Sequence, residues 1–337
     1  MSDSPPLPAP PRHGSDTLPA SRYEPLTAHL VVALVALVVI GGATRVMQAG
    51  LACPDWPLCY GQWLPGGRMN LQVFLEWFHR LDAFVVGIAL LVLSVASWIG
   101  RRRLPAWLPW CAAAALFLVA VQGGLGALTV TRLLAPGLVT AHLGTALLLV
   151  ALLSGVHQAL ERQRLDPSSS PRPVTALPAL PLWWRSLTML VLLVVLGQCL
   201  LGGSLASQWA AERCLAAAEG CQWLLRHRLG ATPTALAVAA LVPASVALPA
   251  GERHLRVFPV LAALLVVVQV ALGVFTLRLQ LAVAAVTVAH QLTAALLVAL
   301  LGAVAGRSLG SSPHPLRQFQ VPAQAPAFTP SADTAHG

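Results

Sequence analysis

The residues best suited to chemistry are a carboxylate and an imidazole close together in a hydrophobic segment. Glu76 and His79 stand at positions i and i+3 within residues 73–98, so a helix would place both side chains on one face. Ionisable groups are costly inside a membrane span and are functional candidates there by default. Arg80 follows Glu76 at i+4, and an ion pair between these two is the structural alternative to a functional role for the carboxylate.

Four histidines share one spacing along the chain. His79 is followed 63 residues later by His142, and His227 is followed 63 residues later by His290. Two imidazoles on facing helices can supply both axial ligands of a haem iron, and a four-helix bundle offers an apolar slot for the macrocycle. Zinc would need further Cys, His or carboxylate ligands, and a di-iron centre would need a second Glu-x-x-His motif. The histidine pairs therefore favour two haem sites.

The composition is that of a membrane protein. Of the 337 residues, 57% are hydrophobic and only 10% are charged, whereas a soluble domain has about 25% charged residues. A membrane span needs roughly 20 apolar residues. Eight segments meet this requirement, and they are 26–47, 73–98, 107–130, 136–160, 183–206, 223–248, 255–277 and 281–306. We therefore predict an all-α, polytopic membrane protein with eight transmembrane helices.

The net charge of +9 indicates membrane topology and not nucleic-acid binding. All 21 basic residues are arginine, and they concentrate in the tails and in the loops that follow even-numbered spans, such as residues 101–103. By the positive-inside rule, these segments and both termini face the cytoplasm. The sequence thus predicts a multi-pass protein of the bacterial inner membrane, with the four histidines toward its outer face.

The second half of the sequence repeats the first. The glycine pair 41–42 recurs as 202–203 at a shift of 161, and both histidines recur at a shift of 148. Four helices per repeat return the chain to its starting side, so we predict two tandem four-helix bundles related by a pseudo-two-fold axis along the membrane normal. Glu76 aligns with Leu224, so the Glu-x-x-His carboxylate occurs in the first half alone.

This repeat predicts an organisation in five parts. Each half carries one histidine pair, and the segments outside the halves are rich in Pro and Ser without hydrophobic periodicity, which is typical of disordered chain. The parts are a cytoplasmic tail at 1–25, a first half at 26–160, a cytoplasmic linker at 161–182, a second half at 183–306 and a cytoplasmic tail at 307–337.

Four of the six cysteines lie in loops on the predicted outer side. Cys53 and Cys59 stand in the first outer loop, and Cys214 and Cys221 stand in the third. Disulfides persist in an oxidising compartment, so we expect a disulfide at each pair. For the first pair a stabilising disulfide and a redox-active one both stay open, whereas the second pair has nothing reactive beside it in the sequence and is expected to be structural.

Three arginines stand at the outer ends of predicted helices, and they are Arg45, Arg132 and Arg278. A guanidinium group is a planar, bidentate donor that suits the propionates of a haem. Long cationic side chains also extend to the membrane surface without any ligand. Both interpretations of these three residues stay open.

The motif Glu76-x-x-His79-Arg80, the four evenly spaced histidines, the four-plus-four repeat and the paired loop cysteines together resemble the haem A synthase family over residues 26–306. The resemblance implies oxidation of the C8 methyl of haem O to a formyl group, which gives haem A for terminal cytochrome oxidases. It therefore implies a membrane oxidoreductase acting on a CH3 group, with a first cysteine pair like the one linked in the family to activity or haem handover.

The resemblance also implies roles for individual residues. His79 and His142 would ligate the substrate haem O, and Glu76 would be catalytic. A haem b cofactor would lie between His227 and His290. The implied partners are haem O synthase, membrane lipid and an electron acceptor that the resemblance leaves open, as it does self-association into a homo-oligomer.

Two alternatives lack substrate chemistry, namely a di-haem b-type electron carrier and a haem transporter. An electron-conducting protein that spans the membrane would hold haems on both sides of the bilayer. All four histidines are instead predicted in the outer half of the membrane, which favours the synthase over the carrier.

Overall fold

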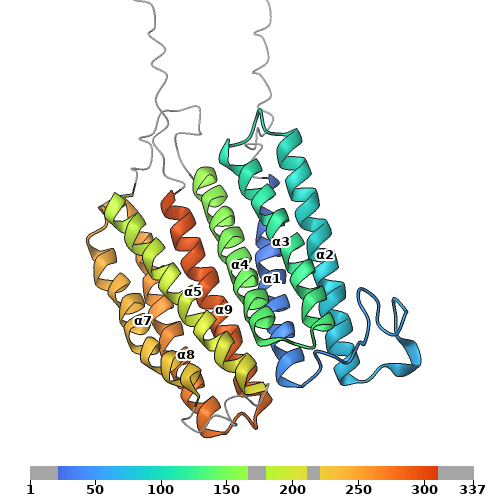
Figure 1. The fold of residues 1–337 in the computed structure, drawn as a ribbon. Coiled ribbons are helices and arrows are strands. Elements are labelled where there is room, and N and C mark those ends of the chain that lie inside the picture. The colour runs from blue at the N-terminus through green and yellow to red at the C-terminus, as the bar shows by residue number, and fades with distance from the viewer. Residues whose placement is uncertain (1–21, 166–179, 211–220, 310–337) are drawn as a thin grey trace, which may run out of the picture.

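The computed structural model describes residues 22–165, 180–210 and 221–309, and this part of the chain is helical without any strand (Figure 1). Eight of its helices are long and apolar enough to cross a membrane, which confirms the predicted all-α, multi-pass membrane fold. In chain order the elements are α1 (Glu24–Val46), η2 (Gly66–Arg68), α2 (Leu71–Ile99), α3 (Trp107–Thr131), α4 (Pro136–Leu165), α5 (Leu182–Ala210), α7 (Gln222–Val246), η4 (Ala250–Arg256), α8 (Val257–Arg278) and α9 (Ala284–Leu309).

The helix ends differ from the predicted spans by a few residues. α9 begins at Ala284, three residues after the predicted start, because Gln280 and Leu281 have φ angles of 51° and 59° and form a turn. α4 continues to Leu165, five residues into the predicted linker. Most of the predicted linker and of both predicted tails lies outside the described residues.

The helices form two adjacent groups (Figure 1). One group is α1 to α4 (blue to green), and the other is α5 and α7 to α9 (yellow to red). The loop between α1 and α2 projects sideways from one end of the bundle, which we call the loop end, and α2, α4, α7 and α9 all begin there. The pseudo-two-fold relation between the groups stays a prediction.

The two groups meet most extensively where α4 packs against α9, and glycines line this contact. A Cβ atom at Gly306 would lie 2.2 Å from the Cα of Gly155, and one at Gly302 would lie 2.6 Å from the carbonyl oxygen of Ala151. Small residues spaced four apart let membrane helices approach this closely. The core around the contact is aliphatic and includes the fully buried Leu90, Leu149, Leu153, Leu241 and Leu301.

The outer surface of the bundle is apolar as well. Val32, Phe117 and Ile99 are each at least two-thirds exposed. A soluble monomer rarely exposes large contiguous apolar patches, whereas lipid contact stabilises them. The surface thus agrees with the length and composition of the helices in indicating a bilayer around the bundle.

Candidate functional site

The first predicted histidine pair is brought together by α2 and α4. The ring centres of His79 and His142 lie 6.4 Å apart, with 68° between the ring planes. An imidazole–metal bond is about 2.0 Å long and the ring centre lies about 1.1 Å behind the ligating nitrogen, so two imidazoles on opposite sides of one metal ion have ring centres about 6.2 Å apart. The pair therefore has the spacing of two axial ligands of one iron.

The second pair comes from α7 and α9, and its members lie close enough to interact electrostatically. The amide nitrogen of Gln198 on α5 lies 3.0 Å from Nδ1 of His227. Nδ1 of His290 lies 3.1 Å from the carbonyl oxygen of Gln269 on α8. At His290 an Nδ1–H donates to this carbonyl oxygen, which fixes the tautomer whose Nε2 can bind a metal. At His227 the Gln198 N–H donates instead, and Nδ1 accepts. The amide nitrogen of Gln269 also lies 3.3 Å from Nε2 of His290, so the fit of this pair to a second iron depends on the two facing imidazoles and not on their present hydrogen bonds.

Each of the four imidazoles rests against a glycine of the helix before it. A Cβ atom at Gly41 would lie 2.9 Å from the ring of His79, and one at Gly202 or Gly273 would lie 3.0 Å from the ring of the histidine on the next helix. At Gly126 the corresponding distance is 3.7 Å. Any larger residue at the three tighter positions would push the ring away, so these glycines set the distance between helix and imidazole.

All four histidines lie near the loop end. Each one stands five to eight residues after the first residue of its helix, which is about 8–12 Å along the axis at 1.5 Å per residue. The structure therefore places the two predicted pairs at similar depth and on one side of the bundle.

Glu76 is buried on α2, and both of its oxygens have partners. Oε1 accepts a hydrogen bond from the guanidinium of Arg80 at 2.5 Å, and Oε2 accepts one from the backbone N–H of Cys53 at 2.8 Å. With these two partners, Glu76 is only 4% exposed. The ion pair that was the structural alternative is thus present, and the catalytic role of Glu76 stays a prediction.

Arg80 fastens the projecting loop to α2. Its guanidinium donates to the carbonyl oxygens of Asp55 at 2.6 Å and Leu58 at 2.5 Å, in addition to Glu76. The loop is closed by the disulfide between Cys53 and Cys59, whose Cα atoms are 4.7 Å apart. Both cysteines are almost fully buried. The disulfide loop and the Glu76 carboxylate therefore form one rigid assembly.

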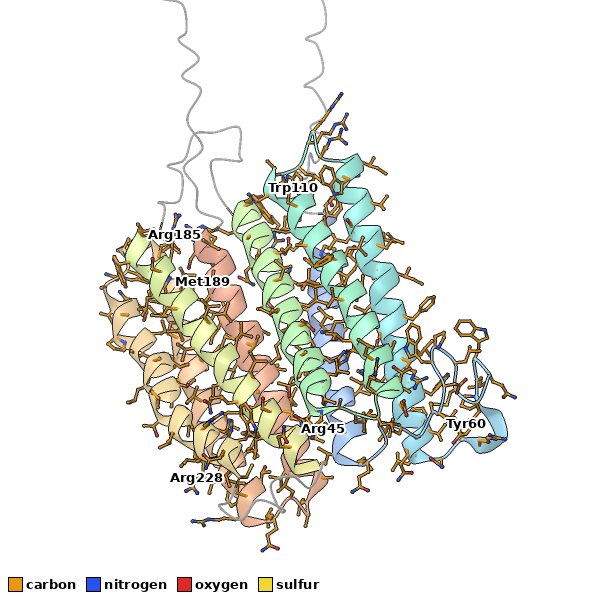
Figure 2. All side chains as sticks on the ribbon, viewed as in Figure 1. Arg45, Tyr60, Trp110, Arg185, Met189 and Arg228 are labelled. Carbon is orange, nitrogen blue, oxygen red and sulfur yellow. A yellow bond between two sulfur atoms is a disulfide. The ribbon has the colours of Figure 1, made fainter. Side chains whose placement is uncertain are left out.

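Asp55 stabilises the outer turn of the same loop, where Tyr60 is found in Figure 2. Its carboxylate accepts hydrogen bonds from the backbone N–H groups of Gly61 at 2.7 Å and Tyr60 at 2.6 Å. These hydrogen bonds, first that of Gly61, lower the pKa of Asp55 below its ordinary value. Tyr60 and Gly61 both have positive φ angles, so the carboxylate supports a backbone conformation that is otherwise unfavourable for Tyr60.

The predicted cysteine pairs have different outcomes. The disulfide between Cys53 and Cys59 is confirmed, while its redox activity stays open. Cys221, the N-cap residue of α7, is disulfide-bonded. Cys214 lies outside the described residues, so its pairing with Cys221 stays a prediction.

The three arginines considered for propionate binding differ in their surroundings. Arg45 donates to the carbonyl oxygen of Ala206 on α5 and lies at the junction of the two helix groups (Figure 2). Arg132 and Arg278 are exposed at the ends of α3 and α8. Contact with propionates stays a prediction for all three, and Arg45 has in addition a structural partner across the junction.

Three features near the histidines were not predicted from the sequence. The glycines behind the rings were seen only as a repeat, and Gln198 was not singled out. Asp82 was also missed, although it is a second carboxylate in the membrane span of α2. The rule that an ionisable residue inside a span is a functional candidate would have found it.

Known proteins are similar to most of this chain. The family model COX15-CtaA, described as cytochrome oxidase assembly protein, matches residues 26–301. A heme A synthase of Rhizorhabdus wittichii is 30% identical over 325 residues, which cover 81% of this chain and 90% of that protein. A heme A synthase of Shewanella oneidensis is 30% identical over 203 residues, which cover 53% of this chain and 56% of that protein. The chain thus spans little more than half the length of this second relative.

A shorter similarity concerns a different activity. A protoheme IX farnesyltransferase of Halobacterium salinarum is 30% identical over 79 residues, which cover 23% of this chain and 17% of that protein.

Proposed function

The chain belongs to the COX15-CtaA family of cytochrome oxidase assembly proteins, and on this basis we propose that it is a haem A synthase that oxidises the C8 methyl of haem O to a formyl group. Relatives named heme A synthase support the proposal, and one of them matches over 90% of its length. The observation that carries the proposal is the His79–His142 spacing of 6.4 Å, one helical turn from the buried carboxylate of Glu76.

In this proposal the two helix groups have different tasks. Haem O as substrate is held between His79 and His142, because this pair alone has the Glu-x-x-His carboxylate beside it. His227 and His290 would hold a haem b, which supplies a one-electron carrier when bound. Arg45, at the junction of the groups, is placed to contact propionates from either site.

Glu76 acts through its fixed charge. Oxidation of the methyl carbon makes it electron-poor before an oxygen atom is added from water, and a negative charge nearby stabilises that state. The hydrogen bonds from Arg80 and from the Cys53 N–H hold the carboxylate in one orientation. Such preorganised charge stabilises a charged transition state more than mobile solvent does.

The test is the haem composition of cells that carry Glu76→Gln. The amide keeps an oxygen that can accept from the Cys53 N–H but removes the negative charge. We expect haem O to accumulate and haem A to be lost, while the protein still binds haem. Unchanged haem A would refute the role of Glu76, and normal haem A in cells that lack this chain would refute the synthase.

A control separates the carboxylate from the loop that it holds. Cys53→Ser opens the disulfide but leaves the charge of Glu76 in place. If Glu76 acted only by anchoring the loop, both variants would lose haem A to the same extent. We expect the larger loss in Glu76→Gln.

The alternatives predict other results for the same variant. A di-haem electron carrier would leave cellular haem O and haem A unchanged, and a haem transporter would alter the location of haem A but not its amount. We further propose that the loop end faces outward from the bacterial inner membrane, with both termini cytoplasmic, and that haem O synthase supplies the substrate. An external acceptor takes up the electrons of the oxidation.

A further inference from the structure

Among the polar groups near the first histidine pair that lack a hydrogen-bond partner in the described part of the chain are Nδ1 of His79, Nδ1 of His142 and the carboxylate of Asp82. Nδ1 of His79 is buried and has no hydrogen-bond partner there. The carboxylate of Asp82 on the same helix takes part in no hydrogen bond or ion pair with any described residue. An unpaired polar group in a membrane interior is costly, and His79 and the half-buried Asp82 are two such groups that share one turn of α2.

The helix geometry brings the two groups within reach of each other. His79 and Asp82 stand at i and i+3, which places their Cβ atoms about 5–6 Å apart on one face. Side chains on a helix lean toward its N-terminus, so the Asp82 side chain covers the turn that carries His79.

The counterpart of Asp82 in the second half of the chain shows which side chain lies beside this position. Asp82 corresponds to Gly230 at the repeat shift of 148, and a Cβ atom at Gly230 would lie 2.4 Å from Oε1 of Gln198. The same Gln198 amide lies 3.0 Å from Nδ1 of His227. Position 230 is therefore adjacent to the group that contacts the histidine, and its counterpart in the first half holds a carboxylate.

We propose that Asp82 is a positioning residue that accepts the Nδ1–H hydrogen bond of His79 when a haem is bound there, which rests on the proposed function. A carboxylate behind a metal-bound histidine orients the ring and raises its basicity. Gln198 provides only a neutral amide behind His227. His79 would therefore be the more basic ligand of the two, and an iron bound there would have the lower midpoint potential.

The test uses the purified protein with both haems bound. Asp82→Asn keeps the shape and removes the charge. We expect a higher midpoint potential for the haem at His79, a shift of its low-spin EPR signal and an affinity for haem about 10- to 100-fold lower at this site. The haem at His227 is the internal control and keeps its potential.

A second variant tests the proposal by giving His79 the same neighbouring residues that His227 has in the second half. Leu37 corresponds to Gln198 at a shift of 161, so Leu37→Gln with Asp82→Gly copies the neutral amide beside His79. The two midpoint potentials are expected to converge. The proposal for Asp82 is overturned if wild type and Asp82→Asn, both with full haem content, have equal midpoint potentials and EPR signals at the His79 haem. It is also overturned if the double variant keeps the difference between the two midpoint potentials that wild type shows. Failure of the synthase is seen separately, as absent haem A formation in wild type.

Discussion

A methyl group added at Gly306 is expected to separate α9 from α4. Its Cβ atom would lie 2.2 Å from the Cα of Gly155, whereas ordinary contacts of a Cβ atom lie at 3.4–4 Å. The opposing atoms belong to backbone, so no side-chain rotation can relieve the clash and the helices move apart by more than 1 Å. A gap of about 0.5–1 Å already forfeits a quarter to a half of the attraction between packed atoms.

The expected loss of stability follows from these contacts. Overpacking costs about 1–3 kcal/mol, and a backbone clash belongs at the upper end. The better helix propensity of alanine offsets about 0.5–1 kcal/mol of this, so Gly306→Ala should lose about 2 kcal/mol net. Gly302→Ala, with 2.6 Å to a carbonyl oxygen of α4, should lose less.

The assay is thermal unfolding of the purified protein in detergent, with Gly123→Ala as the matched control. Gly123 lies on α3, and a Cβ atom there would meet nothing within 4 Å, so its replacement should be neutral or slightly stabilising. The expected order of unfolding temperatures is Gly123→Ala highest, then Gly302→Ala, then Gly306→Ala. A Gly306→Ala protein as stable as the control would refute the close contact of α4 and α9.

Two further predictions concern the disulfide loop. Arg80→Met leaves the Glu76 carboxylate buried without its cation, and breaking such a pair costs about 3–5 kcal/mol of unfolding free energy. The control is Arg228→Met, at an exposed site without an ion pair in the described chain, which should change the unfolding free energy by less than about 0.5 kcal/mol. Equal losses in both variants would contradict the anchoring role of Arg80. The pKa of Asp55 is lowered in the folded loop, so its contribution is complete above the ordinary value of about 3.9 and is lost as the pH falls through the folded pKa. Hydrogen exchange of the Tyr60 and Gly61 amides should therefore lose protection as the pH falls below about 3.9 in wild type. An Asp55→Asn variant should lack this pH dependence, and a pH-independent difference between the two proteins would contradict the prediction.

Much of the fold followed from the sequence because a bilayer imposes strong constraints. A span needs a certain apolar length and satisfies its backbone only as a helix, so hydropathy alone located all eight helices. Their ends were less certain, since a turn such as that at Gln280 and Leu281 depends on backbone angles that apolar residues do not signal. The histidine pairs were predicted from their spacing, because the repeated interval of 63 residues can be read from the sequence without knowing how the helices pack.

The partners of the candidate residues could not be found in the same way. Glu76 accepts from the backbone of Cys53, 23 residues away, and no local pattern predicts a contact with a backbone N–H in a loop. Gln198 on α5 contacts His227 on the neighbouring helix α7, and this contact depends on Gly230 having no side chain. Such contacts are set by tertiary packing, which the order of residues in one helix does not specify.

The two helix groups are also joined at the histidines themselves, by a contact that appears twice. The residue after His290 is Gln291, and a Cβ atom at Gly42 would lie 1.7 Å from its Oε1. Gly42 adjoins Gly41, which supports the ring of His79.

The reverse contact has the same form. Leu143, the residue after His142, lies 2.9 Å from the position of a Cβ atom at Gly203, which adjoins the glycine behind His227. Each glycine pair thus supports the histidine of its own group with one residue and receives the helix of the other group with the next. A shift of one histidine helix would therefore press on the glycine pair of the other group, so we expect the two predicted haem sites to adjust together, although each has its own predicted ligand pair.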